Sequence, residues 1–401
     1  MLRFITAGES HGAALVAILE GMPAGVPLLA DDVDAQLARR QQGYGRGRRM
    51  QIETDRVELL SGVRAGETLG SPIAMLVRNQ DWRNWESIMS PAPIEGDPAL
   101  RKRAVTRPRP GHADLAGMLK YDRADARDIL ERASARETTM RVAAGAVCRT
   151  LLRALDVTIG SHVTELGGIA AARPDTLPDD LNAAADASPI RMLDRDAEAR
   201  IIERIDAAKR DGDTLGGVCE VIVSGLPVGL GTHVSWDGKL DGQLAQALMS
   251  IQAVKGVEIG IGFEAARRPG SAVHDEIEAD QGATLTGRVR RRSNNAGGLE
   301  GGITTGEPLV LRVAMKPIST LMRPLGSIEM ATREPAASTV ERSDVTAVPA
   351  MGVIAEAMTA FVLARAVIEK FGGDSLLELQ RNRSAYLRYL AERDTEDRGG
   401  E

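Results

Sequence analysis

The sequence predicts an α+β fold arranged as one large domain. Apolar runs typical of strands occur singly and in clusters, and they do not alternate strictly with helical segments as in a doubly wound parallel sheet. The chain of 401 residues is long enough to bury a sizeable core. Because no linker and no short-period repeat divides it, we expect one domain over residues 1–390. The charged stretch 391–401 lacks apolar anchors and is expected to fray.

Seven apolar runs predict the strands, at 2–7, 57–63, 72–77, 157–163, 217–226, 256–263 and 308–315. Five segments with helical spacing predict the helices, at 31–42, 134–155, 196–210, 239–254 and 350–371. The second helix should begin at Ser134, because Ser134 and Glu137 stand three residues apart in the capping-box pattern. The last should begin near 346–349, where Pro349 follows a polar run.

Composition excludes several classes of protein. A net charge of -6 and 3% aromatic residues disfavour nucleic-acid and membrane partners. We expect no transmembrane helix, because no run of about 18 uncharged apolar residues occurs. Cys148 and Cys219 lie in apolar segments without metal-ligand spacing, so we expect buried, reduced thiols and no metal site. A cytoplasmic location follows as the expectation.

Basic residues gather in three clusters, at 39–49, 101–112 and 287–295, each beside Gly or Pro. A single such run is most often solvated surface, but guanidinium forks on loops also suit phosphate and carboxylate groups. The three together favour a small polyanionic ligand. The segment GYGRGRR also resembles an RNA-binding sequence, although such sites usually add stacking rings that are scarce here.

Two histidines and one aspartate are candidates for chemistry. His11 lies in GESHG and His112 in RPRPGHAD, where a nearby phosphate would favour a protonated imidazole able to act as a general acid. An ordinary satisfied histidine is the alternative at both positions. Asp344 lies in the loop that leads into the last helix, and it could serve only as a cap.

Three other segments are candidate anion sites. The helix start at RASARET combines backbone N–H groups with Arg132 and Arg136, although a plain cap with surface arginines explains it equally well. The glycine-rich stretch 293–310 suggests backbone held close to a ligand or another chain, or else a floppy loop. The run KPIST at 316–320 offers an ammonium group and two hydroxyls.

These motifs together resemble one known family. GESHG, RPGHAD, RASARET, QAVKGVEIG, SNNAGG, KPIST and RSD occur here in the order found in chorismate synthases, from about residue 1 to residue 370. The resemblance implies a single large β-α-β-α sandwich domain that assembles as a homotetramer. It also implies a lyase of the shikimate pathway, which makes aromatic amino acids.

The resemblance implies conversion of 5-enolpyruvylshikimate 3-phosphate to chorismate and phosphate by an anti 1,4-elimination. The family requires reduced FMN although the reaction has no net redox change, and NADPH is a candidate reductant because some members reduce flavin themselves. An RNA-binding protein and an NADPH-dependent flavin oxidoreductase are the alternative functions. Neither metal nor nucleic acid belongs to the implied activity.

Site residues follow from the resemblance position by position. His112 is implied to protonate the leaving phosphate, His11 to keep the reduced flavin in its proper protonation state, and Asp344 to help the flavin N5 region remove the ring proton. Arg40 and Arg46 match positions for nicotinamide-phosphate or substrate-anion contact, and we favour the substrate anion. The implied flavin-binding residues are Arg132, Ala133, Ser134, Gln252, Ala253, Gly301, Lys316, Pro317, Ile318, Ser319, Thr320 and Arg342.

The sequence departs from the family pattern at two places. Ala133 stands where the family often has a serine, and KPIST replaces a commoner KPTSS-like run, which places Ile318 within it. We expect both segments to bind mainly through backbone N–H groups.

Overall fold

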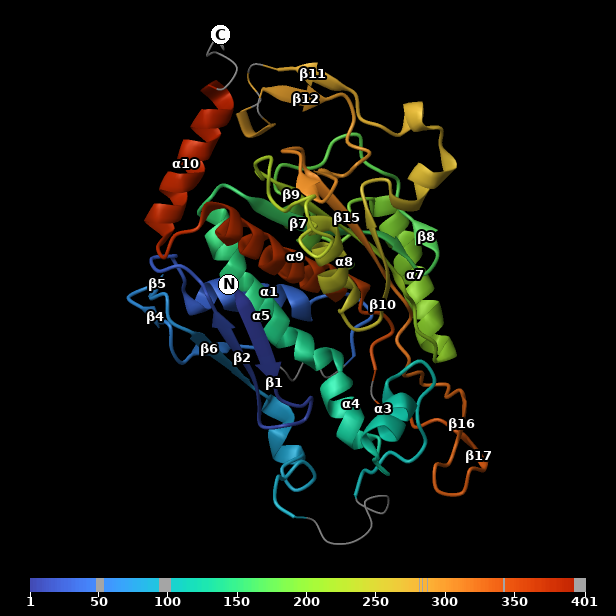
Figure 1. Ribbon diagram of the computed structural model, residues 1–401. Helices are drawn as coiled ribbons and strands as arrows, with labels where there is room; N and C mark the ends of the chain where they lie inside the picture. Colours follow the sequence, from blue (N-terminus) through green and yellow to red (C-terminus); the bar gives the residue numbers. More distant parts are fainter. Residues whose placement is uncertain are drawn as a thin grey trace.

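Two antiparallel sheets face each other across a layer of helices in the computed structural model (Figure 1). The structure describes residues 1–47, 54–93, 102–280, 282, 284–286, 288–341 and 343–392. The first sheet has the order β1 (Arg3–Ala7), β2 (Ala14–Glu20), β6 (Ile73–Arg78), β3 (Val57–Leu59). The second has the order β10 (Val254–Ile259), β15 (Leu309–Met315), β9 (Gly217–Ser224), β7 (Thr158–Leu166), β8 (Ile169–Ala170).

The helices between the sheets form the centre of the core. They are α1 (Ala30–Gln41), α5 (Thr138–Arg153), α8 (Leu240–Met249) and α9 (Val348–Phe371). Helix α5 packs on β2, and α9 packs on β7 and β9. The helices α5 and α9 approach closely at Gly145, where an added Cβ would lie 2.5 Å from the Cβ of Ala357. A larger residue at 145 would therefore push the two central helices apart.

Helix α9 is long and apolar enough to span a membrane by length and composition. However, 83% of its qualifying window is buried inside the protein. Its neighbours are α1, α5, α8 and the second sheet. It is therefore a core helix, which explains why it is apolar all round rather than on one face.

Shorter elements surround this frame. The remaining helices are α3 (Asp114–Tyr121), α4 (Arg127–Ala133), α6 (Leu181–Asp186), α7 (Arg195–Asp211) and α10 (Leu376–Glu392). The 3₁₀ turns are η1 (Gln80–Asn84), η3 (Ala135–Glu137), η4 (Gly262–Arg267), η5 (Gly270–Ala272) and η6 (Thr284–Thr286). Small hairpins pair β4 (Val63–Arg64) with β5 (Glu67–Thr68), β11 (Ile277–Ala279) with β12 (Val289–Arg291), β13 (Leu299–Glu300) with β14 (Ile303–Thr304), and β16 (Gly326–Ile328) with β17 (Pro335–Ala337).

The five predicted helices are all present, with two corrections at their ends. The capping box at Ser134 does not close: Ser134 accepts from the N–H of Arg136, but the Glu137 carboxylate accepts from Thr6, Gln252 and Arg141 instead. A 3₁₀ turn therefore precedes α5, which begins at Thr138. The helix predicted over 239–254 ends at Met249, because the chain turns there into β10. The predicted tail 391–401 lies outside the described residues except for its first two, which end α10.

In the third arginine cluster, three guanidinium groups already have carboxylate partners. Arg290, Arg291 and Arg292 each form an ion pair with a glutamate of a neighbouring strand. In the glycine-rich segment beside it, Gly297 packs on the backbone of Gly260, where an added Cβ would lie 2.3 Å from the Gly260 nitrogen.

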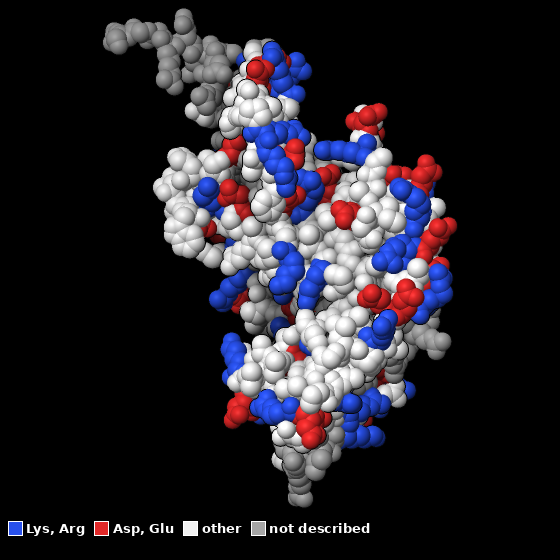
Figure 2. All heavy atoms as spheres, turned by 90° about the vertical axis from the view of Figure 1, so that its right-hand side faces the viewer, with Lys and Arg blue, Asp and Glu red and all other residues white. Residues whose placement is uncertain are grey.

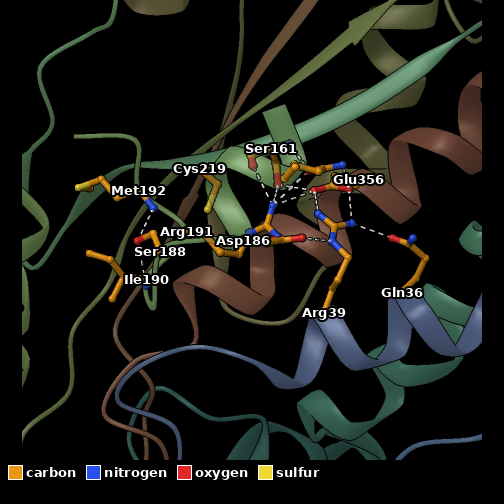
Figure 3. Close-up of polar contacts among 12 residues, drawn as sticks. Gln36, Arg39, Ser161, Asp186, Ser188, Ile190, Arg191, Met192, Cys219 and Glu356 are labelled. Atoms are coloured by element: carbon orange, nitrogen blue, oxygen red, sulfur yellow. Dashed lines mark hydrogen bonds and ion pairs between the residues drawn. The ribbon is translucent and has the colours of Figure 1, made fainter. Parts of the chain in front are cut away.

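A buried ionic cluster joins α1 to α9 (Figure 3). Glu356 on α9 accepts two hydrogen bonds from Arg39 of α1, at 2.9 and 3.0 Å. Arg149 of α5 donates to it at 2.6 Å, and Arg191 at 3.1 Å. The Glu356 side chain is 1% exposed. Asp186 also pairs with Arg39 and Arg191, so two carboxylates compensate three guanidinium groups here and fix where the last turn of α1 lies.

Glu356→Gln is expected to lower the free energy of unfolding by about 3–5 kcal/mol, because it leaves buried arginines facing a neutral amide. Burial acts to raise the pKa of Glu356, but the charges of Arg39 and Arg149 outweigh it and lower the pKa from 4.5 to about 2. The stabilisation is therefore present above about pH 4.5 and is lost as the pH falls toward 2. Urea unfolding at several pH values measures both effects.

Glu369→Gln provides the matched control, since Glu369 is exposed on the same helix. It should change the free energy of unfolding by no more than about 0.5 kcal/mol. Equal losses in the two variants would show that the cluster does not stabilise the fold.

Candidate active site

A cavity of about 1700 Å³ brings together most of the predicted site residues. Its walls come from the β1–β2 turn, the end of α1, the segment from α4 to α5, the start of β10, the segment after β15 and the loop before α9. The predicted residues that line it are His11, His112, Asp344, Arg40, Arg46, Ala133, Ser134, Gln252, Ala253, Lys316, Ile318, Ser319 and Thr320. Segments more than three hundred residues apart in the chain therefore share one site.

The cavity is rich in positive charge. Among the described residues, nine Lys or Arg and five Asp or Glu line it. The basic side chains come from the first two arginine clusters and from four further segments of the chain. Such a lining favours an anionic ligand, because guanidinium groups form paired hydrogen bonds with phosphate and carboxylate oxygens.

The His11 ring is held by a buried carboxylate. Its Nδ1 lies 2.9 Å from Oε1 of Glu131, and its backbone N–H donates to Oε2 at 2.8 Å. Arg127 donates to the same carboxylate at 2.9 Å. Burial acts to raise the pKa of Glu131, but the hydrogen bond from His11 and the charges of His11 and Arg127 outweigh it and lower the pKa. Glu131 is therefore ionised at neutral pH and orients the imidazole through Nδ1.

The His112 ring has a parallel arrangement. Its Nδ1 lies 2.5 Å from Oδ1 of Asp114, a fully buried residue at the start of α3. Arg109 donates to both oxygens of Asp114, at 2.8 and 3.0 Å. Burial acts to raise the pKa of Asp114, but hydrogen bonds from His112 and Arg109 hold it well below its usual range. In both histidines the carboxylate contacts Nδ1, so Nε2 lies on the ring edge away from that carboxylate.

Arg40 and Arg46 line the cavity beside Asp344. Arg40 is 4% exposed and donates to Thr138 and to the carbonyl of Ala135, while its Nη1 lacks a hydrogen-bond partner among the described residues. Burial, together with the charges of Arg136 and Arg46, lowers the pKa of Arg40 from 12.5 to about 9 against the opposing effect of Asp55. Arg40 thus remains a cation at neutral pH in surroundings that favour an added anion.

Asp344 is fixed by its neighbours across the loop. Its Oδ1 accepts from the N–H of Gly47 at 2.6 Å, and its Oδ2 lies 3.3 Å from Nε of Arg46. The N-cap position of α9 is Ala347, and no side-chain hydrogen bond caps the helix there. Asp344 is therefore not the helix cap, which was the alternative interpretation of this residue.

The predicted flavin segments meet on one side of the cavity. Gln252 donates to Glu137 at 3.0 Å, and the N–H of Lys316 donates to the carbonyl of Ala253 at 2.9 Å. Ala253 has φ +66°, a left-handed conformation that non-glycine residues adopt mainly where the surrounding structure requires it. Thr320 accepts from Arg109 at 2.8 Å, which links this segment to the His112 group.

Some predicted residues lie elsewhere. Arg132 does not line the cavity, and it donates to Thr6 and to the carbonyl of Gly8. Gly301 lies in the β13–β14 turn, and Pro317 is not part of the cavity wall. Arg342 lies outside the described residues.

Sequence reasoning missed the residues that hold the histidines. Asp114 follows His112 by two positions, so a nearby carboxylate was a visible signal. Glu131 is 120 residues from His11 and carries no local signal. Trp85 stacks on His11 with ring centroids 3.8 Å apart, and its position in the sequence carries no local signal either.

A family model described as chorismate synthase matches residues 2–368. The chain belongs to the chorismate synthase family. The chorismate synthase of Symbiobacterium thermophilum is 59% identical over 397 residues, which cover 98% of this chain and 100% of that protein. The chorismate synthase of Pelobacter propionicus is 58% identical over 389 residues, with coverage of 96% and 98%. A crystal structure of a chorismate synthase matches with a TM-score of 0.76 and 42% identity, covering 98% of each chain.

The near-complete match confirms the α+β fold and the family resemblance. Chorismate synthases use reduced FMN, and the cavity has features that fit a flavin. Oε1 of Gln252 is buried and accepts no hydrogen bond from the described residues, which suits a ring N–H. The small side chains of Ala133 and Ala253 leave space beside it. Lys316, Ser319 and Thr320 add the donors that a phosphate needs.

Proposed function

We infer that this chorismate synthase converts 5-enolpyruvylshikimate 3-phosphate to chorismate and phosphate with reduced FMN bound. The observation that carries this inference is the single cavity into which His11, His112, Asp344 and an excess of basic residues all face. The substrate carries one phosphate and two carboxylates, so a lining rich in guanidinium groups suits it. Reduced FMN, when bound, supplies transient electron density to the breaking carbon–oxygen bond.

We propose that His112 donates a proton to the leaving phosphate. Asp114 contacts Nδ1, so the proton on Nε2 faces the cavity and can pass to a phosphate oxygen as the carbon–oxygen bond breaks. Arg109 lies beside both residues and adds positive charge where the phosphate leaves. The charge on the departing group is thereby neutralised without water.

Asp344 and His11 complete the proposed set. The Asp344 carboxylate supplies the negative charge that draws away the proton lost from the substrate ring. His11 holds a proton at Nε2 next to the flavin segments, with Glu131 fixing its ring through Nδ1. Arg40 and Arg46 bind anionic groups of the substrate.

An anaerobic assay tests the function. The purified protein, reduced FMN and 5-enolpyruvylshikimate 3-phosphate should yield chorismate absorbance and an equal amount of phosphate. Absence of both products at any protein concentration would overturn the assignment. Consumption of NADPH without the phosphate substrate would instead indicate the flavin oxidoreductase, and RNA retardation in a gel at low salt would indicate the RNA-binding alternative.

The surface offers little support for RNA binding. On the face shown in Figure 2, acidic and basic side chains are intermixed and separated by uncharged areas. The basic residues of the first two clusters that line the cavity are Arg40, Arg46, Arg103 and Arg109. A small buried anion therefore suits their placement better than an extended polymer does.

Arg40→Met is expected to raise KM for the substrate by about 10- to 100-fold, as loss of a charged hydrogen bond does. The free energy of unfolding should change little, because the Nη1 of this buried cation has no hydrogen-bond partner among the described residues and its ion pair with Asp55 is long, at 3.6 Å. Asp55 keeps its partner Arg136, which donates to it at 2.6 Å. Steady-state kinetics and urea unfolding measure the two effects.

Arg153→Met serves as the control, because its ion pair with Asp32 is exposed and far from the cavity lining. It should leave KM unchanged. A wild-type KM in Arg40→Met would remove Arg40 from the binding site.

Four further expectations remain proposals. We propose that residues 1–390 act as one catalytic domain and that the protein assembles as a homotetramer. We also propose that it works in the cytoplasm and that NADPH is a source of reductant for FMN.

A further inference from the structure

We propose that Trp85 is a positioning residue for His11, fixing the plane of the imidazole in the cavity. The proposal rests on the role assigned above to His11. Trp85 follows the 3₁₀ turn η1, which continues from β6, whereas His11 lies in the β1–β2 turn. The two rings meet because β2 and β6 are neighbours in the first sheet.

The contact between the rings is a face-to-face stack. Their centroids lie 3.8 Å apart with an interplanar angle of 24°. The Trp85 side chain is itself held in place, because it is 5% exposed and its Nε1–H donates to the buried Asp81 at 3.1 Å. A rigid indole therefore provides a fixed surface against which the imidazole lies.

Glu131 and Trp85 restrain different motions of the same ring. The carboxylate, 2.9 Å from Nδ1, sets which edge of the imidazole faces it and hence the tautomer. The indole face blocks rotation out of the stacking plane. Neither contact alone fixes the direction of Nε2, but together they do. A proton at Nε2 is thus aimed at one place in the cavity.

Two arginines contact the Trp85 ring that stacks on His11. The guanidinium carbons of Arg103 and Arg127 lie 4.2 and 5.0 Å from the centroid of the Trp85 ring. Arg127 also donates to Glu131 at 2.9 Å, so it contacts both restraints on His11. The arrangement differs from that of His112, which is oriented by Asp114 and Arg109. Packing alone would not require an aromatic ring to be parallel to the imidazole.

The kinetic test compares three variants in the complete assay with reduced FMN. Trp85→Leu should lower kcat by about 10- to 100-fold with KM within a few-fold of wild type, because misplacing a reacting group by about 1 Å can cost that much. Trp85→Phe keeps an aromatic face and should restore kcat to within a few-fold of wild type. Trp82→Leu, in the same turn and not stacked on His11, is the control and should be near wild type.

A fluorescence test probes the stacking of Trp85 on His11 without catalytic turnover. Trp82→Phe with Trp236→Phe leaves Trp85 as the single tryptophan, since the chain has three. We expect that adding His11→Ala changes the fluorescence intensity of the full-length apoprotein, because the imidazole stacked on the indole is removed. His274→Ala in the same background is the control and should leave the fluorescence unchanged, since His274 is exposed and not stacked on Trp85. Circular dichroism on each variant establishes that it is folded.

The two readouts separate the proposal from the function on which it rests. Fluorescence that is the same with and without His11 would overturn the stack, whatever the activity. Wild-type kcat in Trp85→Leu, or an equal loss in Trp82→Leu, would overturn the positioning role while leaving the enzyme assignment intact. Failure of the assay with the unsubstituted chain would instead refute the proposed function.

Discussion

Replacing His112 with alanine is expected to lower kcat by roughly two to four orders of magnitude, the range typical for loss of a general acid. The leaving phosphate would then depart without its proton donor, and only the neighbouring positive charge of Arg109 would stabilise it. KM should change much less, since Arg40, Arg46 and Arg109 remain to bind the substrate anions. Single-turnover formation of chorismate under anaerobic conditions measures the chemical step directly.

His274→Ala is the matched control for this prediction. His274 is exposed and lies outside the cavity lining, so its loss should leave kcat unchanged. A rate near that of the wild type in His112→Ala would remove His112 from the mechanism. The Asp114 carboxylate would then be a structural partner of Arg109 only.

The helices and strands with a clear hydrophobic periodicity or a clear boundary signal could be predicted from the sequence. The long helix α9 begins within two residues of its predicted start, because Pro349 and the polar run before it mark the boundary. Strand β2 was missed, although it lies between β1 and β6 in the first sheet. Its residues ALVAILE are apolar at all but the last position, so they show neither helical nor strand alternation. Its burial alternates nonetheless, because one face packs on the core.

Local motifs identified the candidate catalytic residues but did not reveal all the residues that orient them. His112 and its partner Asp114 lie within one hexapeptide, and the cavity lining includes that segment. His11 depends on Glu131 and Trp85, which come from two other parts of the chain. Contacts of that kind depend on the order of strands in the sheet, which no single motif reveals.

The arginine clusters show why charge pattern alone is an incomplete guide. Arg40 and Arg290 both belong to dense basic runs flanked by glycine. Arg290 pairs with Glu278 on the adjacent strand at 2.9 Å, whereas Arg40 has a buried Nη1 without a hydrogen-bond partner among the described residues. The difference depends on which carboxylates the fold brings near, and only an under-compensated guanidinium group favours an added anion.

Asp344→Asn is expected to lower kcat by roughly two to four orders of magnitude, because the neutral amide lacks the negative charge that helps draw the proton away from the substrate ring. The substitution preserves the shape of the side chain and an oxygen that can accept from the N–H of Gly47. The loop before α9 should therefore keep its place, and thermal unfolding should shift by only a few degrees. A solvent-exchange measurement of the ring proton, made alongside chorismate formation, reports the affected step.

Two comparisons separate this role from the effect of charge alone. Asp206 also lines the cavity and accepts from Tyr44 at 2.8 Å, so Asp206→Asn removes one negative charge from the same space and should leave kcat within a few-fold of wild type. Arg46 faces Asp344 at 3.3 Å, and Arg46→Met should raise KM more than it lowers kcat. Equal losses of kcat in all three variants would mean that the cavity needs its overall charge balance, and not a carboxylate at the position of Asp344.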